Sequence, residues 1–262
     1  MSRQNYYKGR KRRAEKAVDE ELVVELVLRE RRQHPRLGVK KLHHMLRAEL
    51  KEAGVTIGRD RMFAVLRDRG LLVEPLPKSP RTTNSRHSLP VFGNLIADIQ
   101  TREPNQIWVS DLTYLRTKVG YEYLSLITDL HSRKIVGFHS SENLTRDGCL
   151  KALDQALAGL PEGKRPIHHS DRGCQYCSHE YVQRLTNHGL SVSMTEENHC
   201  AENSNAERVN GILKQEYGLG SEFRTREHAR RAVQQAVWLY NNRRPHTSLQ
   251  LQTPADVHAQ AA

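Results

Sequence analysis

The feature that most constrains the fold of this chain is the order of its strand-like and helical segments after residue 105. Three segments rich in β-branched and aromatic residues follow one another across short turns, and further strands then alternate with helices. The expected strands are Gln106–Leu115, Tyr121–Leu130, Lys134–His139, Pro166–His169 and Leu190–Met194, and the expected helices are Arg146–Leu160, Glu180–Asn187, one from about Asn203, and 227–242. This order predicts three antiparallel strands joined to strand–helix units in one mixed α/β sheet.

A helical pattern without strands occupies residues 1–73. Apolar residues at helical spacing predict a helix over residues 12–33 and two shorter helices, the last from Arg59 to Arg69. The apolar positions are Val18, Leu22, Leu26 and Val27 in the first helix, and Val39, Leu42, Met45, Leu46 and Leu50 on one face of the second. The core candidates of the third helix are Met62, Phe63, Val65 and Leu66. Two short helices around a glycine-containing turn suggest helix-turn-helix geometry, although the periodicity alone also fits a plain three-helix bundle.

The positive charge of the chain is concentrated in its first third. Residues 1–90 carry 22 Lys and Arg against 11 Asp and Glu, a net charge of +11, whereas residues 91–262 carry 19 of each sign. A solubilising surface would more often be spread along the chain, so this concentration favours a module that binds a polyanion. We therefore expect a helix-turn-helix that binds DNA, with these candidate contacts: Lys40, Lys41, Arg59, Arg61 and Arg67.

A polar stretch that holds four of the ten prolines separates the helical segment from the sheet. It predicts a linker over residues 74–95, between a helical DNA-binding region at 1–73 and an α/β domain at 96–262. No apolar run approaches the roughly 18 residues that a membrane span needs, and the basic N-terminus lacks the apolar segment of a secretory signal. The four cysteines are too few and too irregular for a disulfide framework, so we expect a cytoplasmic protein.

Three acidic residues occupy positions where the presence of a carboxylate has to be explained. Asp111 interrupts the mostly apolar first strand, "IWVSDLTYL", and Asp171 follows the fourth strand in "PIHHSDRG", at the strand end where open α/β sheets place ligands. Glu207 lies near the start of the helix after the fifth strand. Each acid alone could be a paired or capping residue, but the three converge if the first and fourth strands are neighbours. Converging carboxylates suit Mg²⁺ or Mn²⁺, and two such ions would stabilise an in-line phosphoryl transfer.

Lys214 lies seven residues after Glu207, nearly two helical turns along and on the same side of the helix. If Glu207 faces a metal ion and a phosphate, Lys214 faces the adjacent DNA backbone. The alternative is an ordinary solvated lysine.

The motifs "WVSDLTYL", "HSDRGCQY" and "ENSNAERVNGILKQE", with 35 residues between Asp171 and Glu207, resemble those of the aspartate-aspartate-glutamate transposases. Within that group the chain resembles the catalytic OrfB protein of the IS-three type of bacterial insertion sequence, and retroviral integrases are more distant relatives. "HPRLGVKKLHHMLR" with "GRDRMFAVLRDRGL" is similar to the family's helix-turn-helix, and "YNNRRPHTSLQLQTPADV" to its C-terminal signature. The resemblance therefore covers nearly the whole chain.

The resemblance implies a ribonuclease H-like, integrase-type core of five strands, with Mg²⁺-dependent cleavage at element ends and strand transfer into target DNA. It implies that Asp111, Asp171 and Glu207 form a metal-binding triad for two Mg²⁺ ions, which Mn²⁺ could replace, and that Lys214 contacts DNA. Asn203 and Arg208 are further candidate DNA contacts, although Arg208 stands where the family often has serine.

The resemblance also carries expectations about partners and location. We expect a homo-oligomer bound to the terminal repeats and to target DNA. The family further implies an upstream OrfA protein, fused to this chain or acting with it. The expected location is the bacterial cytoplasm, in association with the nucleoid and without a membrane partner.

Other functions fit the same residues. A structure-specific nuclease would use the same acids without joining strands, because hydrolysis and strand transfer differ only in the nucleophile. A DNA-binding regulator with an inactive nuclease fold is a second alternative, against which the retention of all three acids speaks. Cys174 and Cys177 form a C-x-x-C pair that no second such pair completes as a zinc site, and we expect His168 and His169 to pack or to contact phosphate.

The charge distribution predicts that the N-terminal segment supplies most of the salt dependence of DNA binding. If this segment contacts about six phosphates, log K should fall with log[salt] with a slope of about −5. Removal of residues 1–90 should flatten that slope strongly in equilibrium titrations of element-end DNA over a salt series. An unchanged slope for residues 91–262 would show that the sheet domain binds DNA by itself.

Overall fold

The computed structural model describes residues 3–74, 89–97, 99–196 and 203–260, with the side chains of the first helix given at residue 7 and from residue 18 onward. The chain divides into two compact units, Met1–Leu76 and Pro77–Ala262. In the described ranges no helix is both long and apolar enough to cross a membrane.

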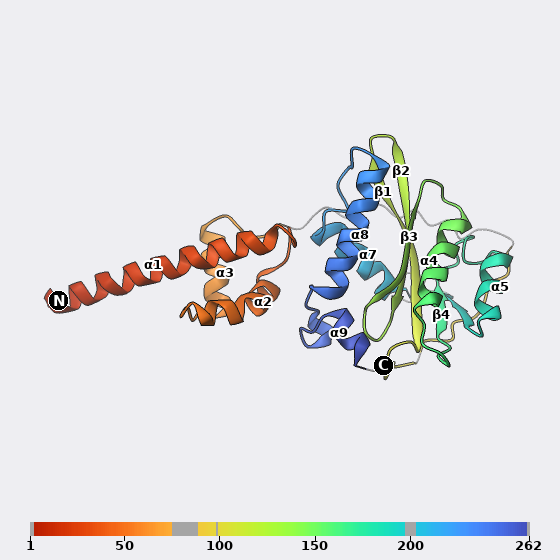
Figure 1. Cartoon of the computed structure of the whole chain (residues 1–262), viewed down its shortest axis with the longest axis horizontal. Coiled ribbons are helices and arrows are strands. Elements are labelled where there is room, and N and C mark those ends of the chain that lie inside the picture. Colours follow the sequence, from red (N-terminus) through yellow and green to blue (C-terminus); the bar gives the residue numbers. More distant parts are fainter. Residues whose placement is uncertain (1–2, 75–88, 98, 197–202, 261–262) are drawn as a thin grey trace. The chain divides into compact units, whose positions relative to one another are not determined.

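The first unit consists of three helices around a small apolar core (Figure 1). They are α1 (Arg3–Arg31), α2 (Val39–Glu52) and α3 (Arg59–Asp68). The core is formed by Val23, Leu26, Val27, Leu37, Leu42, Leu46, Leu50, Val55, Met62 and Leu66. The three predicted helices are therefore present, and the role of α2 and α3 in DNA binding stays a prediction.

Most of the apolar residues that defined these helices in the sequence are buried, but two lie on the surface. Val18 is 70% exposed and Phe63 is 45% exposed. The prediction that Phe63 belongs to the core is wrong, because the apolar run in α3 is wider than the face that the helix buries. Met62, Val65 and Leu66 fill that face, at the spacing of one helical stripe.

The basic side chains that were predicted to contact DNA lie at the surface of this unit. Those of Lys40, Arg59, Arg61 and Arg67 are exposed, and that of Lys41 is half-buried. Arg59 pairs with Asp60 at 2.8 Å, Arg67 with Asp68 at 3.3 Å, and Arg61 with Glu20 of α1. Exposed ion pairs of this kind are weak in water, so DNA phosphates can compete for these arginines.

The second unit is built on a five-stranded sheet in the order β3-β2-β1-β4-β5. The strands are β1 (Ile107–Thr117), β2 (Gly120–Asp129), β3 (Ile135–Ser141), β4 (Ile167–Ser170) and β5 (Ser191–Met194). β2 pairs antiparallel with both β1 and β3, whereas β4 pairs in parallel with both β1 and β5. The predicted mixed sheet is confirmed, and every predicted strand overlaps an observed one.

Helices cover both faces of this sheet (Figure 1). α4 (Arg146–Ala158) and α5 (His179–Asn187) lie on one face, and α7 (Ser204–Glu216) and α8 (Arg226–Asn242) lie on the other. Alternation along β2 divides its side chains between the two layers. Leu124 and Leu126 pack with α7 and α8, whereas Ile127 packs with α4 and α5.

Residues 89–97 run beside β5 and belong to the second unit. The backbone N–H of Met194 donates to the carbonyl of Gly93 at 3.3 Å, and Phe92 packs against the α4–α5 layer. The end of the predicted linker therefore contacts the sheet domain, while residues 75–88 lie outside the described part of the chain. A truncation that tests the salt dependence of DNA binding should accordingly begin at Pro77, so that this packing is kept.

The end of α8 and the residues after it hold α7 and the sheet in place. Arg244 is buried and donates two hydrogen bonds of 2.7 Å to the carboxylate of Glu216, the last residue of α7. The side chain of Asn241 makes two hydrogen bonds of 2.9 Å with the backbone of Ile135 at the start of β3. A bidentate charge pair and an amide–backbone pair are both geometrically specific, so the C-terminal motif has a structural function.

Two short elements near the C-terminus were not predicted from the sequence. They are η1 (Thr247–Leu249) and α9 (Pro254–Ala259). Segments of this length are too short to show a hydrophobic period. Thr253 caps α9 by accepting a hydrogen bond of 3.2 Å from the backbone of Asp256.

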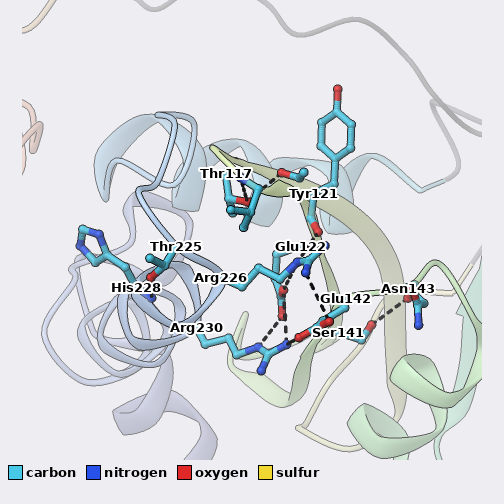
Figure 2. A network of polar contacts seen from close by, with 12 residues as sticks. Thr117, Tyr121, Glu122, Ser141, Glu142, Asn143, Thr225, Arg226, His228 and Arg230 are labelled. Atoms are coloured by element: carbon cyan, nitrogen blue, oxygen red, sulfur yellow. Dashed lines mark hydrogen bonds and ion pairs between the residues drawn. The ribbon is translucent and has the colours of Figure 1, made fainter.

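A buried carboxylate ties α8 to β2 (Figure 2). Glu122 is 0% exposed and accepts a hydrogen bond of 2.6 Å from Arg230 Nε. Arg230 also donates to Glu142 at 3.0 Å, and Arg226 lies 3.4 Å from Glu142 and 4.0 Å from Glu122. The hydrogen bond to Glu122 is the main cause that raises the pKa of Arg230. A carboxylate removed from water needs such partners, because an unpaired buried charge is strongly destabilising.

We predict that Arg230→Ala destabilises the second unit, because it leaves Glu122 with only the more distant Arg226. The expected loss in the free energy of unfolding is about 2–3 kcal/mol, less than for a wholly unpaired buried charge since Arg226 remains. Arg231→Ala, an exposed arginine on the same helix, is the matched control and should change the stability by less than about 0.5 kcal/mol. Denaturant unfolding measures both, and equal stabilities of the two variants would contradict the argument.

Candidate active site

The register of β1 against β4 brings the first two predicted acids together. Ser110 pairs with Ser170 in this parallel ladder. Asp111 and Asp171 are the next residues in the two strands' sequences, so both carboxylates lie at the same level of the sheet. Their predicted convergence required the first and fourth strands to be neighbours, and β1 and β4 are neighbours in the sheet.

The start of α7 is fixed to β1 next to these aspartates. Asn203, the residue before the helix, donates from Nδ2 to the carbonyl of Ser110 at 3.1 Å. Its backbone carbonyl accepts a hydrogen bond of 3.1 Å from the N–H of Glu207. Glu207 is therefore held in the first turn of a helix whose beginning is anchored one residue before Asp111.

Further along, α7 makes two more contacts with β1. Asn210 donates from Nδ2 to Asp111 Oδ2 at 2.7 Å. One turn later, Lys214 Nζ lies 4.8 Å from the centre of the Tyr114 ring. Glu207, Asn210 and Lys214 are spaced by three and four residues, so they share one face of α7. That face runs along β1 from Asp111 to Tyr114.

The charges of the three acids interact most strongly at Asp111. Burial and the charge of Asp171 are the main causes that raise the pKa of Asp111 from an ordinary 3.8 to about 7, and the charge of Glu207 adds to them. Hydrogen bonds from Asn210 and from the backbone N–H of Leu112 act in the opposite direction. The three predicted acids are thus within electrostatic range of one another, although Glu207 is exposed and has the smallest effect.

The chemistry of the site suits a hard divalent cation. All three candidate ligands are carboxylates, and a cation between them would relieve the repulsion that raises the pKa of Asp111. As placed in the described residues, no three Asp, Glu, His or Cys side chains are close enough together to hold a metal ion. A bound ion would therefore require the exposed Glu207 side chain to turn toward the two aspartates.

The other side chains of α7 that were predicted to contact DNA lie in different environments. Lys214 is half-buried, and burial lowers its pKa while the charge of Asp111 opposes that shift. Arg208 is exposed. Asn203 is only 2% exposed, and its amide is directed at the carbonyl of Ser110. In this conformation Asn203 positions the helix and presents almost no surface to DNA.

A buried histidine supports the two aspartate-bearing strands from the opposite face of the sheet. His168 Nε2 lies 2.6 Å from Ser110 Oγ and 3.0 Å from the hydroxyl of Tyr181 on α5. Burial lowers the pKa of His168 to about 3, so its ring is neutral. His169 is also buried, with Nδ1 2.9 Å from Ser193 Oγ. Both histidines pack within the sheet.

The two cysteines of the C-x-x-C pair are in unlike surroundings. Cys174 is exposed, whereas Cys177 is buried with its sulfur 3.6 Å from that of Met194. Burial raises the pKa of Cys177 to about 11, which keeps it a thiol. Neither position has the environment of a metal-binding thiolate.

Comparisons with known proteins identify the family. Two integrase core domain families match residues 101–200 and 188–254. The chain is 35% identical over 242 residues to the insertion element IS600 uncharacterized 31 kDa protein of Shigella sonnei, a match that covers 92% of this chain and 88% of that protein. It is 36% identical over 203 residues to transposase InsF for insertion sequence IS3A of Escherichia coli strain K12, covering 77% and 69%. The chain belongs to the IS-three-type insertion-sequence transposases.

The fold of this transposase also resembles that of a solved intasome. The similarity to a chain of the simian T-cell lymphotropic virus intasome, solved with PP2A regulatory subunit B56 gamma, has a TM-score of 0.52 at 21% identity and covers 84% of this chain and 74% of that chain. At this identity the likeness concerns the fold alone. It confirms the predicted integrase-like core of the transposase.

Two residues of the transposase site were missed in the sequence. Asn210 and Tyr114 both contact residues of the candidate site, Asp111 and Lys214. The spacing of Asn210 from Glu207 and Lys214 was the available signal, because three residues at such intervals must share a helix face. No sequence pattern marked Tyr114 as a residue of the site, because aromatic residues are common in strands.

We predict that Asn210→Ala lowers DNA cleavage by about 10- to 100-fold, the usual effect of losing a side chain that orients a metal ligand. Asn210→Asp should be worse, because it sets a second carboxylate against Asp111. Cleavage rates over a Mg²⁺ series test both, and the deficit of Asn210→Ala should shrink at high Mg²⁺. Gln215→Ala, an exposed amide on the same helix, is the control, and equal rates for Gln215→Ala and Asn210→Ala would refute the role of Asn210.

Proposed function

We propose that this transposase cleaves the ends of an insertion sequence and joins them to target DNA by metal-dependent phosphoryl transfer, with Asp111, Asp171 and Glu207 as the metal-binding carboxylates. The observation that carries the proposal is that the pairing of β1 with β4 brings Asp111 and Asp171 to one level of the sheet, where the charges of Asp171 and Glu207 both act on the buried Asp111. Such repulsion within a half-buried site is unfavourable unless a cation balances it. Perturbed carboxylates of this kind are typical of catalytic centres.

The three carboxylates would hold two Mg²⁺ ions, for which Mn²⁺ can substitute, and these ions would stabilise negative charge on the attacking and leaving oxygens of DNA. The protein's own contribution is to fix the ligands. Asp111 accepts hydrogen bonds from Asn210 at 2.7 Å and from the Leu112 N–H at 2.9 Å. Asp171 accepts one from the N–H of Gly173 at 3.0 Å.

The cations of the chain would bind the DNA that these carboxylates act on. Lys214 and the exposed Arg208 flank Glu207 on α7 and would contact phosphates near the cleaved bond. The basic helical unit would add affinity that is independent of sequence, through Lys40, Lys41, Arg59, Arg61 and Arg67.

We further propose that the protein works in the bacterial cytoplasm as a homo-oligomer on DNA, alone or with an upstream OrfA protein. An insertion sequence has two ends that must be joined to one target, which a single site cannot hold at once. The fold similarity to an intasome chain agrees with such an assembly. A nuclease that does not join strands is the remaining alternative, and a strand-transfer assay on labelled ends separates the two functions.

We predict that Asp111→Asn, Asp171→Asn and Glu207→Gln each abolish cleavage and joining in Mg²⁺. Each amide removes one negative charge from the metal site and leaves the basic helical unit intact, so the affinity for end DNA should largely survive. Asp147→Asn, an exposed acid in the first turn of α4, is the matched control and should cleave normally. Cleavage near the wild-type rate by any of the three variants would overturn the assignment.

A further inference from the structure

An aromatic ring on β1 lies against the Lys214 ammonium, which the charge of Asp111 also reaches. The ammonium nitrogen lies 4.8 Å from the centre of the Tyr114 ring, within the range of a cation–π contact. Tyr121 packs edge-on against the same ring, with centroids 5.4 Å apart and an interplanar angle of 86°. Tyr114 therefore has an aromatic neighbour on β2, and the half-buried lysine contacts the same ring.

The sheet leaves this part of β1 without a neighbouring strand. β4 pairs with β1 only from Ile107 to Ser110, and the next bridge on that edge joins Thr117 to Phe223. Among the described residues, the edge from Asp111 to Leu115 therefore has no strand partner. Tyr114 lies on this open edge, roughly 10 Å along the strand from Asp111. An extended DNA strand that reaches Asp111 along the edge would pass the lysine.

The contact leaves the hydrogen-bonding capacity of the ammonium available. The ring face occupies one side of the group, and an ammonium has three N–H donors. Among the described residues, Lys214 forms no ion pair with a carboxylate within 4.0 Å, although the charge of Asp111 acts on it. A phosphate can therefore approach from the side away from the ring. Because a free lysine side chain has many rotamers, holding it in one position beforehand reduces the entropy lost when DNA binds.

We propose that Tyr114 is a positioning residue that holds Lys214 at the open edge of β1, where its ammonium meets a backbone phosphate of the DNA strand entering the Asp111–Asp171 site. The inference rests on the proposed function and adds to it the residue that orients the lysine. The ring acts through its π face and not through its hydroxyl, so phenylalanine can replace tyrosine and leucine cannot.

The test compares Tyr114→Leu, Tyr114→Phe, Lys214→Ala and the double variant Tyr114→Leu/Lys214→Ala in the full chain, with element-end DNA as substrate. Lys214→Ala should lower kcat/KM by roughly 5- to 150-fold, as expected for the loss of a charge-assisted contact. Tyr114→Leu should lower it by about 3- to 10-fold, mainly through KM, as expected for a lost cation–π contact. Tyr114→Phe should restore most of that loss, and the double variant should be no worse than Lys214→Ala.

Tyr123→Leu is the matched control, because Tyr123 lies directly opposite Tyr114 on β2. It removes an aromatic ring from the same hairpin without removing the ring under Lys214, and it should cleave as wild type does. Equal losses in Tyr114→Leu and Tyr123→Leu would overturn the proposal, as would losses that multiply in the double variant or a Tyr114→Phe variant no better than Tyr114→Leu.

A spectroscopic measurement tests the contact without relying on activity or on the folding of a variant. In the wild-type chain the ε-methylene protons of Lys214, assigned by selective labelling, should be shifted upfield by the ring current of Tyr114. An ordinary lysine shift would overturn the proposal. The proposed function is tested separately: an active Asp111→Asn variant refutes the triad, whereas an inactive Asp111→Asn with an unaffected Tyr114→Leu refutes only the role of Tyr114.

Discussion

The burial of Asp111 next to the charge of Asp171 is the constraint on which the arrangement of the second unit depends. The register of β1 and β4 sets the two carboxylates side by side, and burial together with their mutual charge raises the pKa of Asp111 from 3.8 to about 7. Between these two pH values the folded chain binds more protons than the unfolded chain. The contribution of Asp111 to stability therefore falls as the pH rises through this window, and the full penalty is present above it. The remainder of the unit must offset this cost.

The compensating interactions lie at the ends of α7 and α8. α7 is fixed at its start by Asn203 and at its end by the bidentate pair of Glu216 with Arg244. α8 is fixed to β3 through Asn241 and to β2 through Glu122 and its arginines. The contacts of Glu216 and Glu122 are paired charges, and the Asn241 amide makes two hydrogen bonds, so each of these specifies one geometry. Asn203 adds a single hydrogen bond. These contacts hold the elements that carry the two carboxylates in place, although the carboxylates themselves repel each other.

The sequence predicted the parts of this arrangement that are local. Strand alternation, turn residues and helical spacing located every strand of the sheet. They placed Asp111 within a strand, Asp171 at the end of a strand and Glu207 near the start of a helix. The convergence of those acids depended on the pairing of β1 with β4, which local patterns leave open and which the family resemblance favoured. Contacts between distant residues gave no signal: Asn210 and Asp111 are 99 positions apart, and Arg244 and Glu216 are 28 apart. For Phe63 a local pattern gave a wrong prediction. This apolar residue of α3 was assigned to the core, but Met62, Val65 and Leu66 already fill the buried face of the helix.

The order of side chains on the inner face of α7 follows from what each one faces. Glu207, in the first turn, benefits from the positive end of the helix dipole, and Lys214 benefits from the negative end. Between them, Asn210 meets the carboxylate of Asp111 directly. An acid there would add a further negative charge to the site, and a lysine would compete with a metal ion for the same oxygens. An amide can donate a hydrogen bond to the carboxylate without neutralising the carboxylate's charge, which stays available to a cation. The sequence of acid, amide and cation along one helix face is therefore set by the two aspartates that it covers.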